Sequence, residues 1–192
     1  MARALLAGGA GILQYRHKGF WSRDRFDEAR QIGLLCRAAA IKFVVNDRAD
    51  YAAILNQAGI PAGLHLGQED LSPRDARTIV GPDVPLGFST HNQEQMSAAA
   101  VEPVDYVGFG PVFGTATKEN PDPATGVAAL RHARETTRLP VVAIGGITLA
   151  TAGECLRAGA DSVAVISALM TPPFSLPGVT EQMREWRRLV RS

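Results

Sequence analysis

The chain repeats one pattern, in which a short apolar run is followed by a segment of helical periodicity. The runs are continuous, contain many β-branched and aromatic residues, and lie at Gly11–Gln14, Ile41–Asn46, Gly63–Leu66, Pro85–Ser89, Asp105–Gly110, Pro140–Gly145 and Ser162–Ser167. Continuous runs of this length predict strands buried on both faces, as in a parallel sheet. Most of the runs start 20 to 22 residues apart, with longer gaps after the first and the fifth.

Helical segments with capping residues fill the intervals. We expect helices at Ser22–Ala38, Arg48–Gln57, Ser72–Val80, Asn92–Ala100, Val127–Thr137, Leu149–Ala158 and Val179–Val190. Strict alternation of strand and helix predicts an α/β domain spanning residues 1–192 around a parallel sheet. That sheet is either open and doubly wound or closed as a (β/α)8 TIM barrel.

A closed barrel needs eight strands, and the sequence contains seven. The segment Met1–Gly8 resembles the end of a helix whose preceding strand is absent. Either the sheet is open, or a barrel has lost its first strand and most of its first helix. In the incomplete barrel, the place beside Gly11–Gln14 would be filled by an upstream segment or by another chain.

Charge and cysteine content exclude several classes of function. The net charge is +1 without a basic block, which argues against nucleic acid or a membrane surface as a partner. Glycines interrupt the apolar start, and no run of about 18 apolar residues follows, so we expect neither a signal peptide nor a membrane span. Cys36 and Cys155 form no metal-binding motif, which favours a cytoplasmic protein. Whether the chain forms a homo-oligomer is left open.

Polar residues follow the first strand at alternating positions. Gln14, Arg16 and Lys18 share one face of an extended segment, while Tyr15 and His17 share the other. Two cations and an amide on one face suit a polyphosphate, since Arg can make two hydrogen bonds to one phosphate group. A solvated basic turn is the alternative.

Two aspartates follow neighbouring strands. Asp47 comes after Asn46 at the end of the second strand, and Asp70 follows the third. Together they could hold Mg²⁺, which takes one or two protein carboxylates and fills its remaining positions with water and phosphate oxygens. Helix N-capping is the alternative, and the two roles are compatible.

The later strand ends carry further candidates. Ser89 lacks the motif of a nucleophile elbow, so we expect it to bind a ligand or to cap a helix. The long loop at 111–126 predicts a lid that carries Lys118, with a solvated linker as the alternative. Gly145 and Gly146 allow a close backbone approach to a ligand, and the turn at Ile166 and Ser167 offers N–H groups to an anion.

Eight short motifs occur in the order found in one enzyme family. They are Gln14-x-Arg16-x-Lys18, Asn46-Asp47-Arg48, His65-Leu66-Gly67-Gln68-Glu69-Asp70, Ser89-Thr90-His91, Gly110-Pro111-Val112-Phe113, Thr115-x-Thr117-Lys118, Ala143-Ile144-Gly145-Gly146-Ile147 and Ala164-Val165-Ile166-Ser167. Over roughly residues 10–168 the chain thus resembles the thiamine phosphate synthase family. The resemblance implies a (β/α)8 barrel and a Mg²⁺-dependent transferase of thiamine biosynthesis. Such an enzyme joins 4-amino-5-hydroxymethyl-2-methylpyrimidine diphosphate to 4-methyl-5-(2-hydroxyethyl)thiazole phosphate and releases pyrophosphate.

The resemblance also implies a role for each matching residue. The pyrimidine diphosphate would be held by Gln14, Arg16, Lys18, Asn46, Ser89 and Lys118, with Asp47 and Asp70 as the Mg²⁺ ligands. The thiazole phosphate would be held by Thr115, Thr117, Gly146, Ile166 and Ser167. Catalysis would rest on Arg16, Lys18 and Lys118, which neutralise the charge of the departing pyrophosphate.

Two other functions remain open at this point. A related thiazole tautomerase moves a proton and needs no pyrophosphate-binding cations, and His91 could act as its acid and base. A truncated relative that binds these ligands without catalysis is the other, because the first strand is missing.

Overall fold

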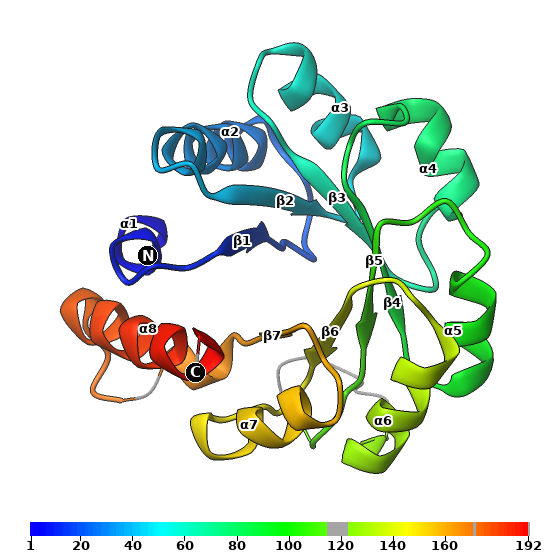
Figure 1. Cartoon of the computed structure of the whole chain (residues 1–192). Helices are drawn as coiled ribbons and strands as arrows, with labels where there is room; N and C mark the ends of the chain where they lie inside the picture. The colour runs from blue at the N-terminus through cyan, green and yellow to red at the C-terminus, as the bar shows by residue number, and fades with distance from the viewer. Residues whose placement is uncertain (115–122, 171, 192) are drawn as a thin grey trace.

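In a computed structural model, which describes residues 1–114, 123–170 and 172–191, the strands form one parallel sheet in chain order. The strands are β1 (Ile12–Tyr15), β2 (Lys42–Asn46), β3 (Gly63–Leu66), β4 (Leu86–Thr90), β5 (Tyr106–Phe109), β6 (Val141–Ile144) and β7 (Ser162–Ala164). The sheet curls into part of a barrel (Figure 1). All seven predicted strands are confirmed to within three residues at either end.

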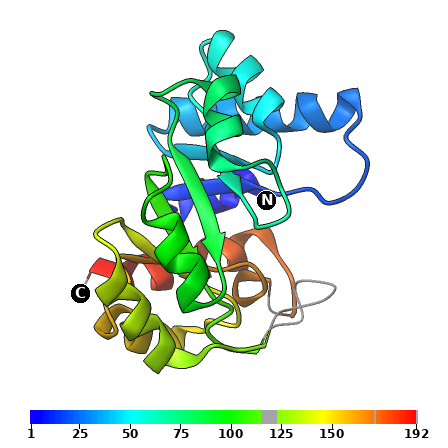
Figure 2. The same ribbon diagram turned by 90° about the vertical axis from the view of Figure 1, so that its right-hand side faces the viewer.

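The helices lie outside the curled sheet, as Figures 1 and 2 show from two directions. They are α1 (Ala2–Ala7), α2 (Arg23–Ala38), α3 (Ala49–Gln57), α4 (Pro73–Val80), α5 (Gln93–Ala99), α6 (Gly126–Thr136), α7 (Leu149–Arg157) and α8 (Leu176–Arg191), with a short 3-10 helix η1 (Ser167–Leu169). The predicted helices are confirmed with shifts of a few residues. Within the described ranges, every helix is too short or too polar to cross a membrane.

The two faces of the sheet differ in burial, because helices cover only the outer face. Residues that face the helices, such as Val45, Leu64 and Val107, are completely buried. Along β6 buried and half-buried residues alternate, and Ile12 in β1 is 51% exposed. The hydrophobic core therefore lies between strands and helices. The inner face of the sheet is exposed at the edge strand β1 and half-buried at β6, but it is buried at β3 and at β2, where Val44 and Asn46 are each 5% exposed.

Strands β1 and β7 are the edges of the sheet, and no backbone ladder joins them in the described part of the chain. Outside them, α1 and α8 lie side by side (Figure 1). The hydroxyl of Thr180 in α8 donates to the carbonyl oxygen of Ala4 in α1 at 3.1 Å. The sheet is thus a partial barrel of seven strands, and the eighth strand of the expected barrel stays a prediction.

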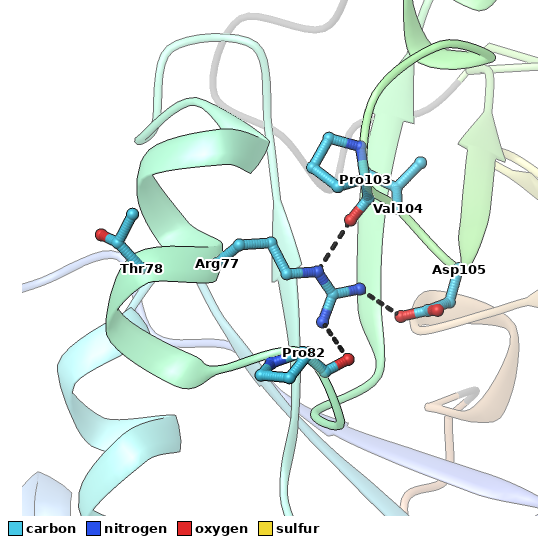
Figure 3. A pocket seen from close by; sticks show the side chains of 6 residues that line it. All are labelled: Arg77, Thr78, Pro82, Pro103, Val104 and Asp105. Carbon is cyan, nitrogen blue, oxygen red and sulfur yellow. Dashed lines mark hydrogen bonds and ion pairs between the residues drawn. The ribbon is translucent and has the colours of Figure 1, made fainter.

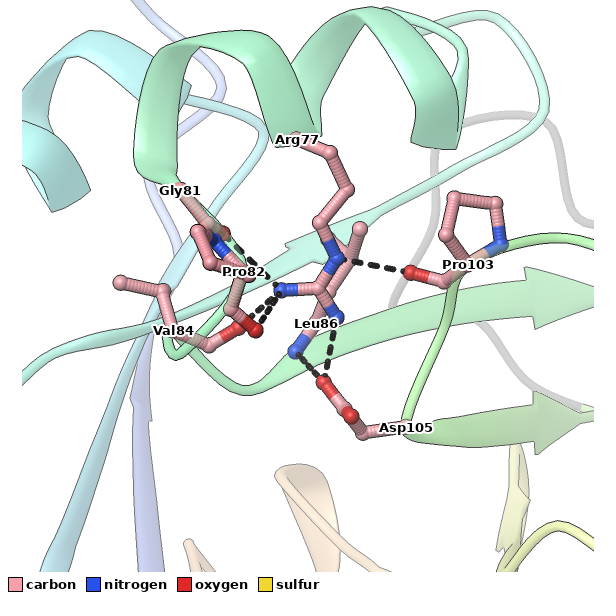
Figure 4. A network of polar contacts seen from close by, with 7 residues as sticks. All are labelled: Arg77, Gly81, Pro82, Val84, Leu86, Pro103 and Asp105. Atoms are coloured by element: carbon pink, nitrogen blue, oxygen red, sulfur yellow. Dashed lines mark hydrogen bonds and ion pairs between the residues drawn. The ribbon is translucent and has the colours of Figure 1, made fainter.

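One arginine ties together the segments that enter β4 and β5 (Figure 4). The guanidinium of Arg77 in α4 donates, at 2.6 to 3.2 Å, to the carboxylate of Asp105 and to the carbonyl oxygens of Gly81, Pro82, Val84 and Pro103. The same Asp105 oxygen accepts the backbone N–H of Leu86, the first residue of β4, at 2.7 Å. We refer to Arg77 and Asp105 as the α4 clamp.

A second clamp repeats this arrangement two βα units later. Arg134 in α6 donates to Asp161 at 3.2 Å and to the carbonyl oxygen of Leu139 at 2.8 Å. Asp161 accepts the backbone N–H of Val141, the first residue of β6, at 2.8 Å. Both clamps therefore fix the amino-terminal ends of strands, opposite the end where the candidate site residues lie.

Candidate functional site

The carboxyl ends of β1 and β2 bring a cation and a carboxylate into contact. The ammonium of Lys18 donates to one carboxylate oxygen of Asp47 at 2.5 Å, and the amide of Asn46 donates to the other at 2.5 Å. Lys18 is half exposed, whereas Asn46 is buried. Because Asp47 follows β2 directly, the sheet itself places this carboxylate at the mouth of the partial barrel.

Asp70 lies close enough to Asp47 to influence its titration. Burial raises the pKa of Asp47, and the nearby Asp70 carboxylate raises it further. The Lys18 ammonium acts in the opposite direction. Asp70 itself accepts the backbone N–H of Gly67 at 2.7 Å. The predicted pair of carboxylates is therefore assembled, and a cation between them would relieve the repulsion that raises the pKa.

The capping roles considered for these aspartates are wrong. Helix α3 starts after Arg48 and has no side-chain cap, while α4 is capped by Ser72, which accepts the backbone N–H of Asp75. Asp47 also has a positive φ of 67°, a conformation that few side chains adopt. Both carboxylates are thus available for a role other than capping.

The donor set fits Mg²⁺. In the described ranges, no three His, Cys, Asp or Glu side chains come together as a metal-binding group, so the site offers two carboxylates. Mg²⁺ bound with phosphates needs only one or two protein carboxylates. Two adjacent carboxylates repel each other, and a bound cation would remove that repulsion.

An aromatic cluster anchors the loop between β1 and α2. The indole N–H of Trp21 donates to the carbonyl oxygen of His17 at 3.1 Å, and the Trp21 ring packs edge-on against Tyr51. The Arg48 guanidinium lies 4.1 Å from the centre of the Tyr51 ring and 5.2 Å from that of Trp21. This cluster holds the loop that carries Arg16 and Lys18 against the start of α3.

The alternation predicted after β1 is confirmed where contacts define it. Tyr15 faces α2 and donates to Glu28 at 2.6 Å, and His17 contacts Trp21 and the carbonyl oxygen of Phe20. Gln14, Arg16 and Lys18 are exposed, and Lys18 faces Asp47. The structure brings Lys18, Asn46, Asp47 and Asp70 together and leaves Gln14 and Arg16 accessible beside them.

Ser89 contacts a residue that sequence reasoning did not select as a site residue. Its hydroxyl lies 2.8 Å from Nε2 of His65, whose Nδ1 lies 3.0 Å from the hydroxyl of Tyr106. Burial lowers the pKa of His65 to about 4, which keeps the ring neutral. Helix α5 is capped by Asn92, so the capping role considered for Ser89 is wrong. Two glycines inside strands, Gly87 and Gly108, were the available signal, because strand glycines mark positions where other groups approach closely.

The candidate residues for the thiazole phosphate are only partly described. Gly146 has a φ of 64°, and a Cβ there would lie 2.4 Å from the carbonyl oxygen of Gly114. The group that lies close to the Gly146 backbone is therefore another part of the chain. Ile166 immediately precedes η1, whose first residue is Ser167. Thr115, Thr117 and Lys118 lie outside the described residues, as does the part of the proposed lid at 115–122.

An open pocket of about 590 Å³ lies at the other end of the sheet. Arg77, Thr78, Pro82, Pro103, Val104 and Asp105 line it (Figure 3). These residues belong to α4 or to the segments that enter β4 and β5, and the Arg77 guanidinium is committed to the α4 clamp. Because reactive groups of parallel α/β folds gather at the carboxyl ends of strands, we assign this pocket a structural role.

Comparisons with known proteins agree on one family. A family model described as thiamine monophosphate synthase matches residues 1–169. The thiamine-phosphate synthase of Koribacter versatilis is 47% identical over 174 residues, which is 90% of this chain and 79% of that protein. That of Chloroflexus aurantiacus is 38% identical over 97% of this chain and 82% of its own length. A thiamine phosphate pyrophosphorylase from Pyrococcus furiosus superimposes with a TM-score of 0.84 and 32% identity, covering 99% of this chain and 87% of that one.

Proposed function

The chain belongs to the thiamine monophosphate synthase family, and from this membership we propose how its site makes thiamine phosphate. The protein is a transferase, a thiamine-phosphate synthase. Its proposed substrates are 4-amino-5-hydroxymethyl-2-methylpyrimidine diphosphate and 4-methyl-5-(2-hydroxyethyl)thiazole phosphate. The observation that supports the assignment best is the contact of Lys18 with Asp47 beside Asp70, which combines a phosphate-binding cation with two carboxylates suited to Mg²⁺.

The reaction replaces one bond of a methylene carbon by another. The bond from that carbon to the diphosphate oxygen breaks first, pyrophosphate leaves with the bonding electrons, and the ring nitrogen of the thiazole then bonds to the carbon. Arg16 and Lys18 bind the diphosphate and neutralise the charge that develops on it. Lys118 joins them in this proposal on the strength of the resemblance. No side-chain nucleophile is required.

Asp47 and Asp70 would hold Mg²⁺ in this proposal. Bound there, the ion supplies positive charge to the diphosphate oxygens. Asn46 fixes one oxygen of Asp47, and Gly67 fixes one oxygen of Asp70, so both carboxylates are oriented before substrate arrives. Lys18 would share Asp47 with the metal and could move to the diphosphate, because ammonium groups reorient easily.

Product analysis tests the function directly. Incubation with both substrates and Mg²⁺ should yield thiamine phosphate by mass spectrometry and one pyrophosphate per product. A chelator should abolish both, since the carboxylate pair then faces the diphosphate without a cation. Stabilisation by both substrates without product would contradict the proposal. A tautomerase would release no pyrophosphate at all.

We further propose that a strand lies between β7 and β1 in the active enzyme and completes a (β/α)8 barrel. In support, β1 and β7 are both edge strands, Ile12 is 51% exposed, and α1 and α8 already meet outside the gap. A chain extended ahead of Met1 by one strand and the missing start of α1 should show slower amide exchange in β1 and β7 and a higher Tm. Unchanged exchange in both strands would refute the added strand. A cytoplasmic location and formation of a homo-oligomer also stay predictions.

A further inference from the structure

Three polar side chains from adjacent strands form a chain of contacts inside the partial barrel. Tyr106 of β5, His65 of β3 and Ser89 of β4 are joined by the 3.0 and 2.8 Å contacts of the two His65 ring nitrogens. His65 is 9% exposed, and Tyr106 and Ser89 are partly buried. Ser89 lies nearest the carboxyl ends of the strands, where the phosphate-binding residues are.

The absence of a side chain at Gly87 makes the contact of His65 with Tyr106 possible. In the sheet register Gly87 lies between His65 and Tyr106, and Gly108 lies beside Ser89. A Cβ on Gly87 would lie 2.1 Å from Cζ of Tyr106 and 2.5 Å from Nδ1 of His65. The missing side chain on β4 therefore lets residues of β3 and β5 reach across it.

The directions of the two hydrogen bonds of His65 are linked, because the neutral ring carries a single proton. A neutral imidazole has one N–H and one acceptor nitrogen. Among the described residues, Nδ1 of His65 is the acceptor within reach of the Tyr106 hydroxyl. If Tyr106 donates to Nδ1, the ring proton lies on Nε2 and is donated to the Ser89 oxygen. The hydrogen of the Ser89 hydroxyl is then left for another acceptor.

We propose that Tyr106 is a positioning residue that, through His65, makes Ser89 a hydrogen-bond donor to the substrate diphosphate. The proposal rests on the proposed function, because it takes the diphosphate as the ligand of Ser89. With the opposite arrangement, Ser89 would donate to Nε2 and would present only lone pairs to an anion. The Tyr106 hydroxyl thus acts on the ligand without touching it. The backbone of Ser89 is held as well, since the Gln68 amide donates to its carbonyl oxygen at 2.6 Å.

A double-mutant cycle tests this role. We expect Ser89→Ala to raise KM for the pyrimidine diphosphate about tenfold and Tyr106→Phe to raise it about threefold, with kcat largely retained. In the Ser89→Ala background, Tyr106→Phe should have no further effect on KM, since Tyr106 acts through that hydroxyl. An equal effect of Tyr106→Phe in both backgrounds would mean a merely structural role and would overturn the proposal. Tyr15→Phe is the matched control, because Tyr15 also donates one hydrogen bond but faces α2, and its KM should equal that of the unmodified chain.

The ring proton can be located independently of activity. Nitrogen-15 NMR of the imidazole, assigned by the loss of its signals in His65→Gln, should show protonated Nε2 and unprotonated Nδ1. Protonated Nδ1 would refute the hydrogen-bond direction. If the chain makes no thiamine phosphate, the proposed function fails, while the NMR result still decides whether Ser89 is a donor.

Discussion

Replacing Asp70 with asparagine should lower kcat by about 100- to 1000-fold at saturating substrates, because several kcal/mol of charge stabilisation by the bound cation is lost. Asparagine keeps the shape of the side chain and can still accept the N–H of Gly67, which holds one oxygen at 2.7 Å. The fold should therefore persist, and thermal unfolding should show a Tm close to that of the unmodified chain. Turnover is measured as pyrophosphate release across a titration of Mg²⁺, and the variant should need a higher concentration for half-maximal rate.

Glu69→Gln is the matched control for this variant. Glu69 is exposed and lies next to Asp70 in the same loop, so the substitution removes the same charge from almost the same place. We expect its kcat and its Mg²⁺ dependence to stay near those of the unmodified chain, because Glu69 is exposed and its charge is screened by salt. If Asp70→Asn retained a normal kcat/KM, Asp70 would not be a metal ligand.

Arg77→Ala should destabilise the protein by about 3 kcal/mol and lower Tm by about 9 °C. The reason is that several carbonyl groups and the carboxylate of Asp105 lose their charged hydrogen-bond donor. The side chain of Arg77 is only 15% exposed, whereas that of Asp105 is 53% exposed. We therefore attribute most of the loss to the carbonyl contacts and little to the ion pair. Thermal and urea unfolding measure the change, and kcat at a temperature where the variant is folded should be retained.

Arg74→Ala is the control one turn earlier in the same helix. Arg74 is 68% exposed and contacts Glu102 alone among the described residues, so its removal should cost no more than about 0.5 kcal/mol. Equal losses from Arg77→Ala and Arg74→Ala would show that the α4 clamp contributes nothing beyond an exposed ion pair.

The strands were predictable from sequence because each is covered on its outer face and enclosed within a parallel sheet. Val44 and Val45 illustrate this, since both are buried and stand in a run without polar alternation. The aspartates at the strand ends were predictable for a related reason. Parallel strands deliver the residues that follow them to one edge, so Asp47 and Asp70 meet although 23 positions separate them in the sequence.

The hydrogen-bond chain of Tyr106, His65 and Ser89 was not predictable in the same way. Their contact depends on the register of three strands and on the absence of a side chain at Gly87. The clamps were missed because Arg77 and Arg134 look like solvated helix residues, and their carbonyl partners leave no mark in the sequence. Periodicity reports burial, and it contains no information on which backbone groups a long side chain will reach.

The two clamps affect how this enzyme can evolve. Arg77 with Asp105 and Arg134 with Asp161 secure strand entries, at the end of the sheet remote from Lys18, Asp47 and Asp70. Substitutions that strengthen the clamp end can add a reserve of thermal tolerance without altering the phosphate-binding loops. That reserve would let the catalytic loops accept destabilising replacements, so new acceptor specificities should be easiest to select in chains whose clamps have first been reinforced.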